Sequence, residues 1–161
     1  MSRETPAPRS AFRIWRRFTS RWSDNDAYGH VNNVVFYQWF DSAVNAWLID
    51  QQMLDIASGD PIGLVVETRC TYFAPLQFPQ DVEVGLAVAQ LGRSSIRYRI
   101  GVFGVGEEQA AAQGEFVHVT VDRVSRRPRR NSPPLAFEAG RDQLRRSRTL
   151  AAAYCSASRS T

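Results

Sequence analysis

Residues 33–50 restrict the fold of this chain most, because their apolar side chains spread over more than one face of a helix. A helix on a protein surface keeps its apolar residues in one stripe, whereas a helix that is apolar on several sides is enclosed by other elements. Asn32 or Asn33 can cap its start, since an asparagine side chain accepts a hydrogen bond from the first turn. We therefore expect one long buried helix. Its apolar positions are Val35, Phe36, Trp39, Phe40, Ala43, Val44, Trp47 and Leu48.

Alternating sequences on both sides of this helix predict the strands that enclose it. One side of a half-buried strand before the helix would carry Phe12, Ile14, Phe18 and Trp22. Four longer strands are expected after the helix, over residues 63–73, 81–90, 94–105 and 109–122. In the first of these, one face is expected to hold Leu64, Val66, Cys70 and Tyr72. Together the patterns predict an α+β fold, in which a strongly curved antiparallel sheet wraps around the helix.

The length of 161 residues fits one globular domain with a sizeable core. We expect a disordered arm over residues 1–11, the folded domain over 12–125 and a basic tail over 126–161, with a short helix at 135–146. No stretch approaches ~18 uninterrupted apolar residues, and proline and arginine interrupt the N-terminal segment where a signal peptide would be apolar. The sequence therefore predicts a soluble cytoplasmic protein without a membrane partner.

The chain has two cysteines and two histidines. Cys70 lies in an apolar, strand-like run and Cys155 in a polar tail, so neither a disulfide framework nor the ligand spacing of a zinc site is present. We expect no metal and no cofactor.

The net charge of +4 is distributed unevenly along the chain. Residues 123–161 hold ten arginines and two acidic residues, a net charge of +8, which leaves −4 for residues 1–122. Nucleic-acid binding is therefore not expected of the folded body. The basic tail is read as a solvated terminus, with the steering of polyanions such as coenzyme phosphates as the alternative.

The chemistry is expected in residues 24–33, with the sequence Asp-Asn-Asp-Ala-Tyr-Gly-His-Val-Asn-Asn. Two carboxylates stand directly before a helix start, which carries a partial positive charge and unpaired N–H groups. Hydrolysis of a thioester needs a carboxylate that attacks or activates water and donors for the developing oxyanion. The segment can supply both.

The pattern Asp-x-Asp-x-x-Gly-His-Val-Asn-Asn before a hydrophobic helix resembles the 4-hydroxybenzoyl-CoA thioesterase branch of the hotdog superfamily, over roughly residues 12–125. The turns at 72–76 and 91–95 also match. The resemblance implies a hotdog fold that hydrolyses acyl-CoA, with coenzyme A as part of the substrate. It implies that Asp26 is the catalytic carboxylate, as nucleophile or general base, and that the backbone N–H near Asn33 is the oxyanion donor. The alternative for Asp26 is a turn aspartate that caps the backbone.

Three other residues of the segment have more than one interpretation. Asp24 is expected to hold the turn, with an effect on the charge of Asp26 as the alternative. His30 either donates a hydrogen bond to the substrate carbonyl or to a carboxylate, or has a structural role. Asn32 either caps the helix, the preferred interpretation, or contacts substrate.

Outside the segment, four residues are candidates for binding. Arg93 and Ser94 are expected to contact coenzyme phosphates, since the planar guanidinium binds two phosphate oxygens. Glu67 is interpreted as a solvent-exposed strand residue, or as a residue that enters the active site from a second chain. Asp41 lies in the apolar helix and should face a polar pocket, a partner subunit or an arginine, because an unpaired buried carboxylate is costly.

The resemblance also implies partners. Two chains would join their sheets in a homodimer with each active site at the subunit boundary, and dimers of dimers, or homotetramers, occur in this branch. A non-catalytic acyl-binding or assembly module is the alternative function. A hydratase is less favoured, because the helix lacks the Asp and His pair expected of one. The sequence does not predict the acyl group.

Overall fold

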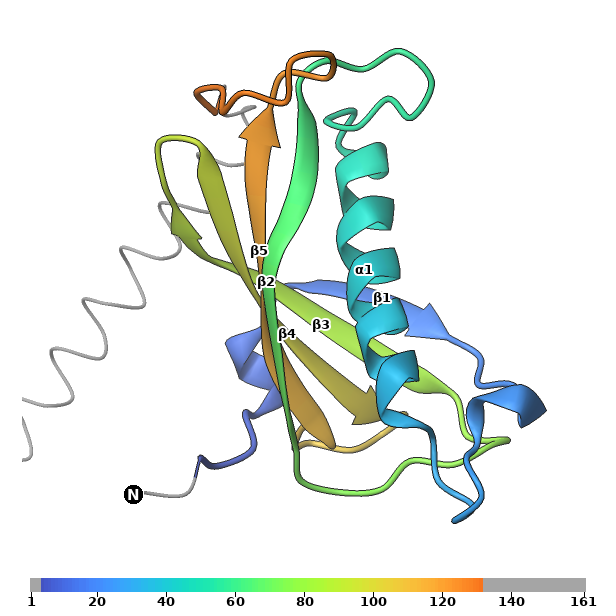
Figure 1. Cartoon of the computed structure of the whole chain (residues 1–161). Coiled ribbons are helices and arrows are strands. Elements are labelled where there is room, and N and C mark those ends of the chain that lie inside the picture. The colour runs from blue at the N-terminus through green and yellow to red at the C-terminus, as the bar shows by residue number, and fades with distance from the viewer. Residues whose placement is uncertain (1–3, 132–161) are drawn as a thin grey trace, which may run out of the picture. The chain divides into compact units, whose positions relative to one another are not determined.

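The computed structural model describes residues 4–131 and contains one sheet and one long helix (Figure 1). The five antiparallel strands have the spatial order β1-β3-β4-β5-β2, and α1 lies along one face of the sheet. The predicted α+β architecture is thereby confirmed. The elements are β1 (Ile14–Phe18), α1 (Asn33–Asp50), β2 (Ile62–Tyr72), β3 (Val82–Leu91), β4 (Ser95–Gly104) and β5 (Ala112–Val121), with short 3-10 helices at Arg9–Ala11 and Trp22–Asp24.

Helix α1 has the predicted bounds and the predicted buried residues. Its N-cap is Asn32, whose side-chain oxygen accepts a hydrogen bond from the Val34 N–H at 3.1 Å. All eight apolar positions named from the sequence are buried. They form one broad stripe that faces the sheet, whereas Val34, Gln38, Asp41 and Ile49 are exposed on the opposite side. Within one chain α1 therefore covers one face of the sheet and is not enclosed on several sides as the sequence predicts.

The sheet contributes its α1-facing side to the same core. Leu86 of β3 pairs with Ile100 of β4, and both side chains are buried. Phe116 of β5 meets Phe40 of α1 edge to face, with ring centroids 6.3 Å apart. This packing joins strands that lie far apart in the sequence to a single helix.

Strand β2 differs from the prediction of one shared face. The register with β5 shifts between Val65 and Glu67, so that Val66 is an extra residue in the strand. As a result Leu64 pairs with Val119 but Cys70 with Gly114, an odd number of positions along β5, and the two side chains point to opposite faces. Cys70 and Tyr72 therefore face α1, whereas Leu64 faces outward. A bulge of this kind leaves no signal in a hydrophobic pattern.

Residues 4–11 also differ from the expected arm, because they pack across the outer face of the sheet. The Ala7 N–H donates to the Gln113 side chain at 2.7 Å, and Arg9 forms an ion pair with Glu83 at 2.8 Å. Phe12, buried at the end of this segment, lies against Gly85 and Gly101. These contacts are made by single residues and backbone groups, so the sequence shows no repeating hydrophobic pattern that would predict them. Residues 1–3 and 132–161, including the predicted helix over 135–146, lie outside the described residues.

Within residues 4–131, no helix combines the length and the apolar character that a membrane crossing requires.

Candidate functional site

The segment before α1 is a short antiparallel hairpin. The Asn32 N–H donates to the Asp24 carbonyl at 2.8 Å, and the Asp26 N–H donates to the His30 carbonyl at 2.8 Å. Gly29, at the tip, has a φ of +79°, a conformation that glycine adopts without strain. In this hairpin Asp26 lies opposite His30. Asp24, two residues earlier, pairs with Asn32, the N-cap of α1.

The Asp26 side chain, half-buried, is fixed by its own turn. Its Oδ1 accepts hydrogen bonds from the backbone N–H groups of Tyr28 at 2.8 Å and His30 at 3.4 Å. The capping role that the sequence left as the alternative is therefore present. The other oxygen, Oδ2, accepts no hydrogen bond from any residue between 4 and 131. One carboxylate oxygen thus fixes the geometry while the second is available for chemistry.

The first turn of α1 leaves one backbone donor unused. The Val34 N–H is bound by the Asn32 side chain, and the Val35 N–H donates to the Asn32 carbonyl at 3.0 Å. The Asn33 N–H makes no hydrogen bond within the described part of the chain. An unpaired N–H at a helix start favours negative charge on whatever it binds.

Asp24 holds the turn, as predicted. Its side chain is 2% exposed and accepts from the Arg21 backbone N–H at 2.8 Å and from the Arg21 Nε at 3.0 Å. Both carboxylate oxygens are thereby paired, so Asp24 is unsuited to react with a substrate. The His30 side chain is exposed and forms no hydrogen bond, ion pair or ring contact with any residue between 4 and 131, which leaves both of its interpretations open.

Tyr37, Tyr72 and Cys70 lie near the start of α1. The sequence left Tyr37 as either an acyl-pocket or a core residue, and it placed Tyr72 and Cys70 only on a strand face. The Tyr72 hydroxyl donates to the Asn33 carbonyl at 3.4 Å, and its ring packs edge to face on Phe36 at 5.1 Å. Burial first, and then hydrogen bonds with Cys70 and Tyr37, raise the pKa of Tyr72 above its ordinary value. Burial also raises the pKa of the Cys70 thiol to about 11. Tyr72 and Cys70 are therefore neutral at physiological pH, and the bulge in β2 brings both of them to the face of the sheet that carries α1.

Glu67 and Asp41 lie away from the hairpin. Glu67 projects from the outer face of β2 and pairs with Arg97 at 3.3 Å; Arg97 also binds Glu115 at 2.7 Å. Asp41 is exposed on α1. Burial lowers the pKa of His118 below its ordinary value, and the negative charge of Asp41 opposes part of this shift. Neither carboxylate joins Asp26 within one chain.

Arg93 and Ser94 occupy the turn between β3 and β4, at the opposite end of the sheet from Asp26 (Figure 1). The Ser94 carbonyl accepts from the Thr120 N–H at 2.7 Å, close to where β5 pairs with the start of β2. Asp26, in contrast, precedes the first turn of α1, beside the end of β2. One chain therefore does not bring the predicted phosphate contacts and the predicted carboxylate together.

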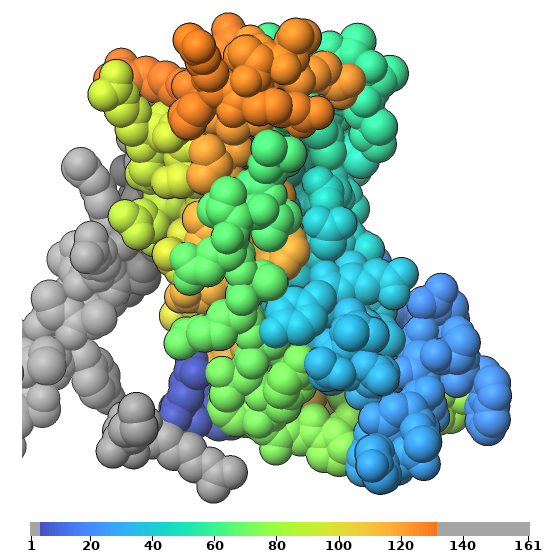
Figure 2. Space-filling model, viewed as in Figure 1, coloured from blue at the N-terminus to red at the C-terminus, as the bar shows by residue number. Residues whose placement is uncertain are grey.

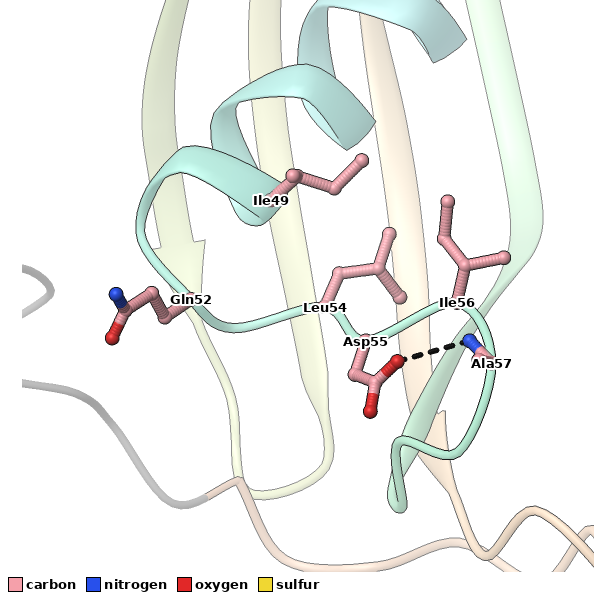
Figure 3. Close-up of a pocket in the computed structure, with 6 residues that line it drawn as sticks. All are labelled: Ile49, Gln52, Leu54, Asp55, Ile56 and Ala57. Carbon is pink, nitrogen blue, oxygen red and sulfur yellow. Dashed lines mark hydrogen bonds between the residues drawn. The ribbon is translucent and has the colours of Figure 1, made fainter.

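A cavity of about 470 Å³ lies at the C-terminal end of α1 (Figure 3). Its apolar side is formed by Ile49, Leu54 and Ile56, and it contains none of the predicted site residues. Its remaining lining residues are Gln52, Asp55 and Ala57. No group of histidine, cysteine, aspartate and glutamate side chains within residues 4–131 is arranged to hold a metal ion.

Comparison with known proteins gives the family. The model of the thioesterase-like superfamily matches residues 20–139, while no curated protein matches the chain. Among solved structures, the PA5185 protein of Pseudomonas aeruginosa strain PAO1 is 49% identical over 80% of this chain and 89% of its own, with a TM-score of 0.76. The PA2801 protein of Pseudomonas aeruginosa is 26% identical over 78% of this chain and 95% of its own, with a TM-score of 0.70.

A more distant structure shows the same fold. It is Slr0204, a 1,4-dihydroxy-2-naphthoyl-CoA thioesterase from Synechocystis, which is 19% identical over 79% of this chain and 93% of its own, with a TM-score of 0.67. Since the family model spans most of the chain and a solved relative shares about half of the aligned residues, the chain belongs to the thioesterase-like superfamily and has its hotdog fold.

Proposed function

We propose that this protein hydrolyses an acyl-CoA thioester to the free acid and coenzyme A. The observation that carries the proposal is one hairpin that holds both an unpaired carboxylate oxygen, Oδ2 of Asp26, and an unpaired helix N–H, that of Asn33. Family membership supports the thioester as the substrate. Assignment to the 4-hydroxybenzoyl-CoA branch rests on the motif over residues 24–33.

Two routes fit the carboxylate. As a general base, Asp26 takes a proton from water, whose oxygen attacks the thioester carbonyl carbon. The C–S bond then breaks, and the proton held by Asp26 passes to the leaving sulfur, which departs as the coenzyme A thiol. As a nucleophile, Asp26 forms a mixed anhydride and releases coenzyme A, and water then hydrolyses the anhydride. In both routes the carbonyl oxygen becomes negative, and the Asn33 N–H stabilises it. His30 and Asn32 would orient the substrate at this end.

The site becomes complete when a second copy is added. Strand β2 lies at an edge of the sheet, and Figure 2 shows it uncovered along the front of the molecule. Leu64, Val65 and Val66 are exposed there, and a long apolar edge strand invites pairing. Antiparallel pairing of β2 with the β2 of a second chain places the Tyr72 end of one strand beside the Ile62 end of the other. We propose this homodimer as the functional unit, with dimers of dimers as the larger assembly.

Substituting Val66 with lysine should break the homodimer. Val66 is 60% exposed in the middle of the edge strand, and a lysine there disfavours strand pairing. Analytical ultracentrifugation should give the wild type a mass of at least twice the 18.2 kDa chain, and the variant the mass of one chain. Val105→Lys, an exposed valine in a turn outside β2, should leave the assembly unchanged. A dimeric Val66→Lys variant would place the interface elsewhere.

The experiment that tests the function is a hydrolysis screen with aromatic, branched and medium-chain acyl-CoA thioesters, with the matching acyl carrier protein thioesters alongside. Release of free thiol with at least one acyl-CoA substrate is the expected result. A second function, a non-catalytic acyl-binding module, is favoured by the capping role of Asp26, which accounts for that residue without catalysis. Binding of acyl-CoA without release of thiol across the panel would establish it instead.

A further inference from the structure

The segment that follows β2 holds the hairpin of the candidate site. The Val31 N–H donates to the Leu76 carbonyl of this segment at 2.8 Å. The Phe78 N–H donates to the side-chain oxygen of Asn25, the neighbour of Asp26, at 3.1 Å. Because Asn25 and Val31 pair with each other across the hairpin, both of its sides are attached to the same segment.

Tyr72, the last residue of β2, makes a separate contact with the first turn of α1. Its hydroxyl donates to the Asn33 carbonyl at 3.4 Å, and its ring packs edge to face on Phe36 with centroids 5.1 Å apart. No other side chain between residues 4 and 131 forms a hydrogen bond with the backbone of Asn33. Tyr72 is itself held by the pairing of β2 with β5, opposite Ala112. The first turn of α1 is therefore tied to the sheet through one hydroxyl group.

The two groups of the candidate site are carried by different elements. Asp26 belongs to the hairpin, whereas the Asn33 N–H belongs to the first turn of α1. Both must contact the same thioester carbonyl group, and a displacement of about 1 Å can lower a rate ~100-fold. Since a helix end frays readily, a bond from a neighbouring strand to the first turn restricts the position of the Asn33 N–H.

The Tyr72 hydroxyl is suited to hold this turn because it keeps its proton. Burial first, and then hydrogen bonds with Cys70 and Tyr37, raise the pKa of Tyr72 above its ordinary value. The hydroxyl therefore remains a donor at every pH at which Asp26 would act. Its neighbours also restrict the direction in which it points.

We propose that Tyr72 is a positioning residue for thioester hydrolysis, whose hydroxyl holds the first turn of α1 so that the Asn33 N–H faces the substrate carbonyl beside Asp26. The inference rests on the proposed thioesterase function. Tyr72 acts through Asn33 and takes no part in proton transfer. Because the carbonyl oxygen becomes negative only as the reaction proceeds, a displaced N–H lowers kcat and leaves KM nearly unchanged.

Tyr72→Phe tests the proposal, since phenylalanine keeps the ring on Phe36 and removes only the hydroxyl. We expect kcat for the best acyl-CoA substrate to fall at least ~10-fold with KM within about twofold of the wild type. The pH dependence of kcat should keep its shape. Tyr98→Phe is the matched control, because the Tyr98 hydroxyl is buried and forms no hydrogen bond within residues 4–131. Its kcat should stay within about twofold of the wild type.

Hydrogen exchange of the Val34 and Val35 amides, followed by NMR, gives a second measurement that needs no turnover. Exchange should be at least ~5-fold faster in Tyr72→Phe than in the wild type, and unchanged in Tyr98→Phe, because the first turn opens more often without its bond to β2. Equal kcat values for the two variants would overturn the proposal. A raised KM with unchanged kcat, or a lower kcat without faster exchange, would do so as well, because Tyr72 would then act on the substrate directly.

Failure of the proposed function has a different signature. If the wild type hydrolyses no thioester and exchange is still faster in Tyr72→Phe, the proposed hydrolysis is wrong, whereas the bond that holds the first turn of α1 is real.

Discussion

Substituting Asp26 with asparagine should lower kcat for thioester hydrolysis at least ~100-fold, the size expected for loss of a principal acid or base. The asparagine keeps the side-chain oxygen that accepts from the Tyr28 and His30 N–H groups, so the hairpin should retain its geometry. It loses the negative charge and the unpaired oxygen that would take a proton or attack the carbonyl. Steady-state kinetics with the best substrate of the acyl-CoA panel measures the loss, and thermal unfolding checks that the fold is intact.

The matched control is Glu83→Gln. It removes one carboxylate charge from the outer face of the sheet, where Glu83 pairs with Arg9, and should leave kcat within about twofold because it lies outside the hairpin. Asp26→Ala separates the two roles further, since alanine removes the cap as well as the charge. If Asp26→Asn turns over like the wild type while Asp26→Ala loses stability, the aspartate is only a turn residue and the catalytic assignment fails.

The sequence predicts the fold closely where neighbouring residues alone determine the local structure. The apolar run after Asn32 gave the bounds of α1, because a capping asparagine and a wide apolar surface are both local signals. The bulge at Val66 and the packing of Phe12 on Gly85 were not predicted. Both depend on the register or the shape of a distant strand, which a single sequence does not display.

The candidate site also has features that neighbouring residues determine and features that depend on distant parts of the chain. The hairpin and the cap lie within ten consecutive residues, so the sequence could place the carboxylates beside the helix start. It could not show that Oδ1 of Asp26 is already occupied, nor that Tyr72 reaches Asn33. The separation of Arg93 from Asp26 follows from the antiparallel sheet, which places the turn between β3 and β4 at the opposite end from the start of α1. A single sequence does not display this distance, because it depends on how the strands pair.

Substituting Gly114 with alanine should destabilise the protein by about 3 kcal/mol, the upper end of the usual range for overpacking a core. A Cβ at this position would overlap the Arg69 carbonyl oxygen of β2 and lie 2.6 Å from Cε2 of Phe40. The first neighbour is backbone and the second is a ring enclosed between helix and sheet, so neither can withdraw without moving an element. Thermal unfolding should show a midpoint lowered by about 10 °C.

Gly104→Ala, at the end of β4, is the matched control. Its Cβ would also meet a neighbour, but that neighbour is the amide at the end of the Gln80 side chain, which can rotate away. The cost there should stay below about 1 kcal/mol. Similar melting temperatures for the two variants would mean that β2 and α1 can separate at Gly114, and that the edge strand is held less tightly against the core than its pairing with β5 implies.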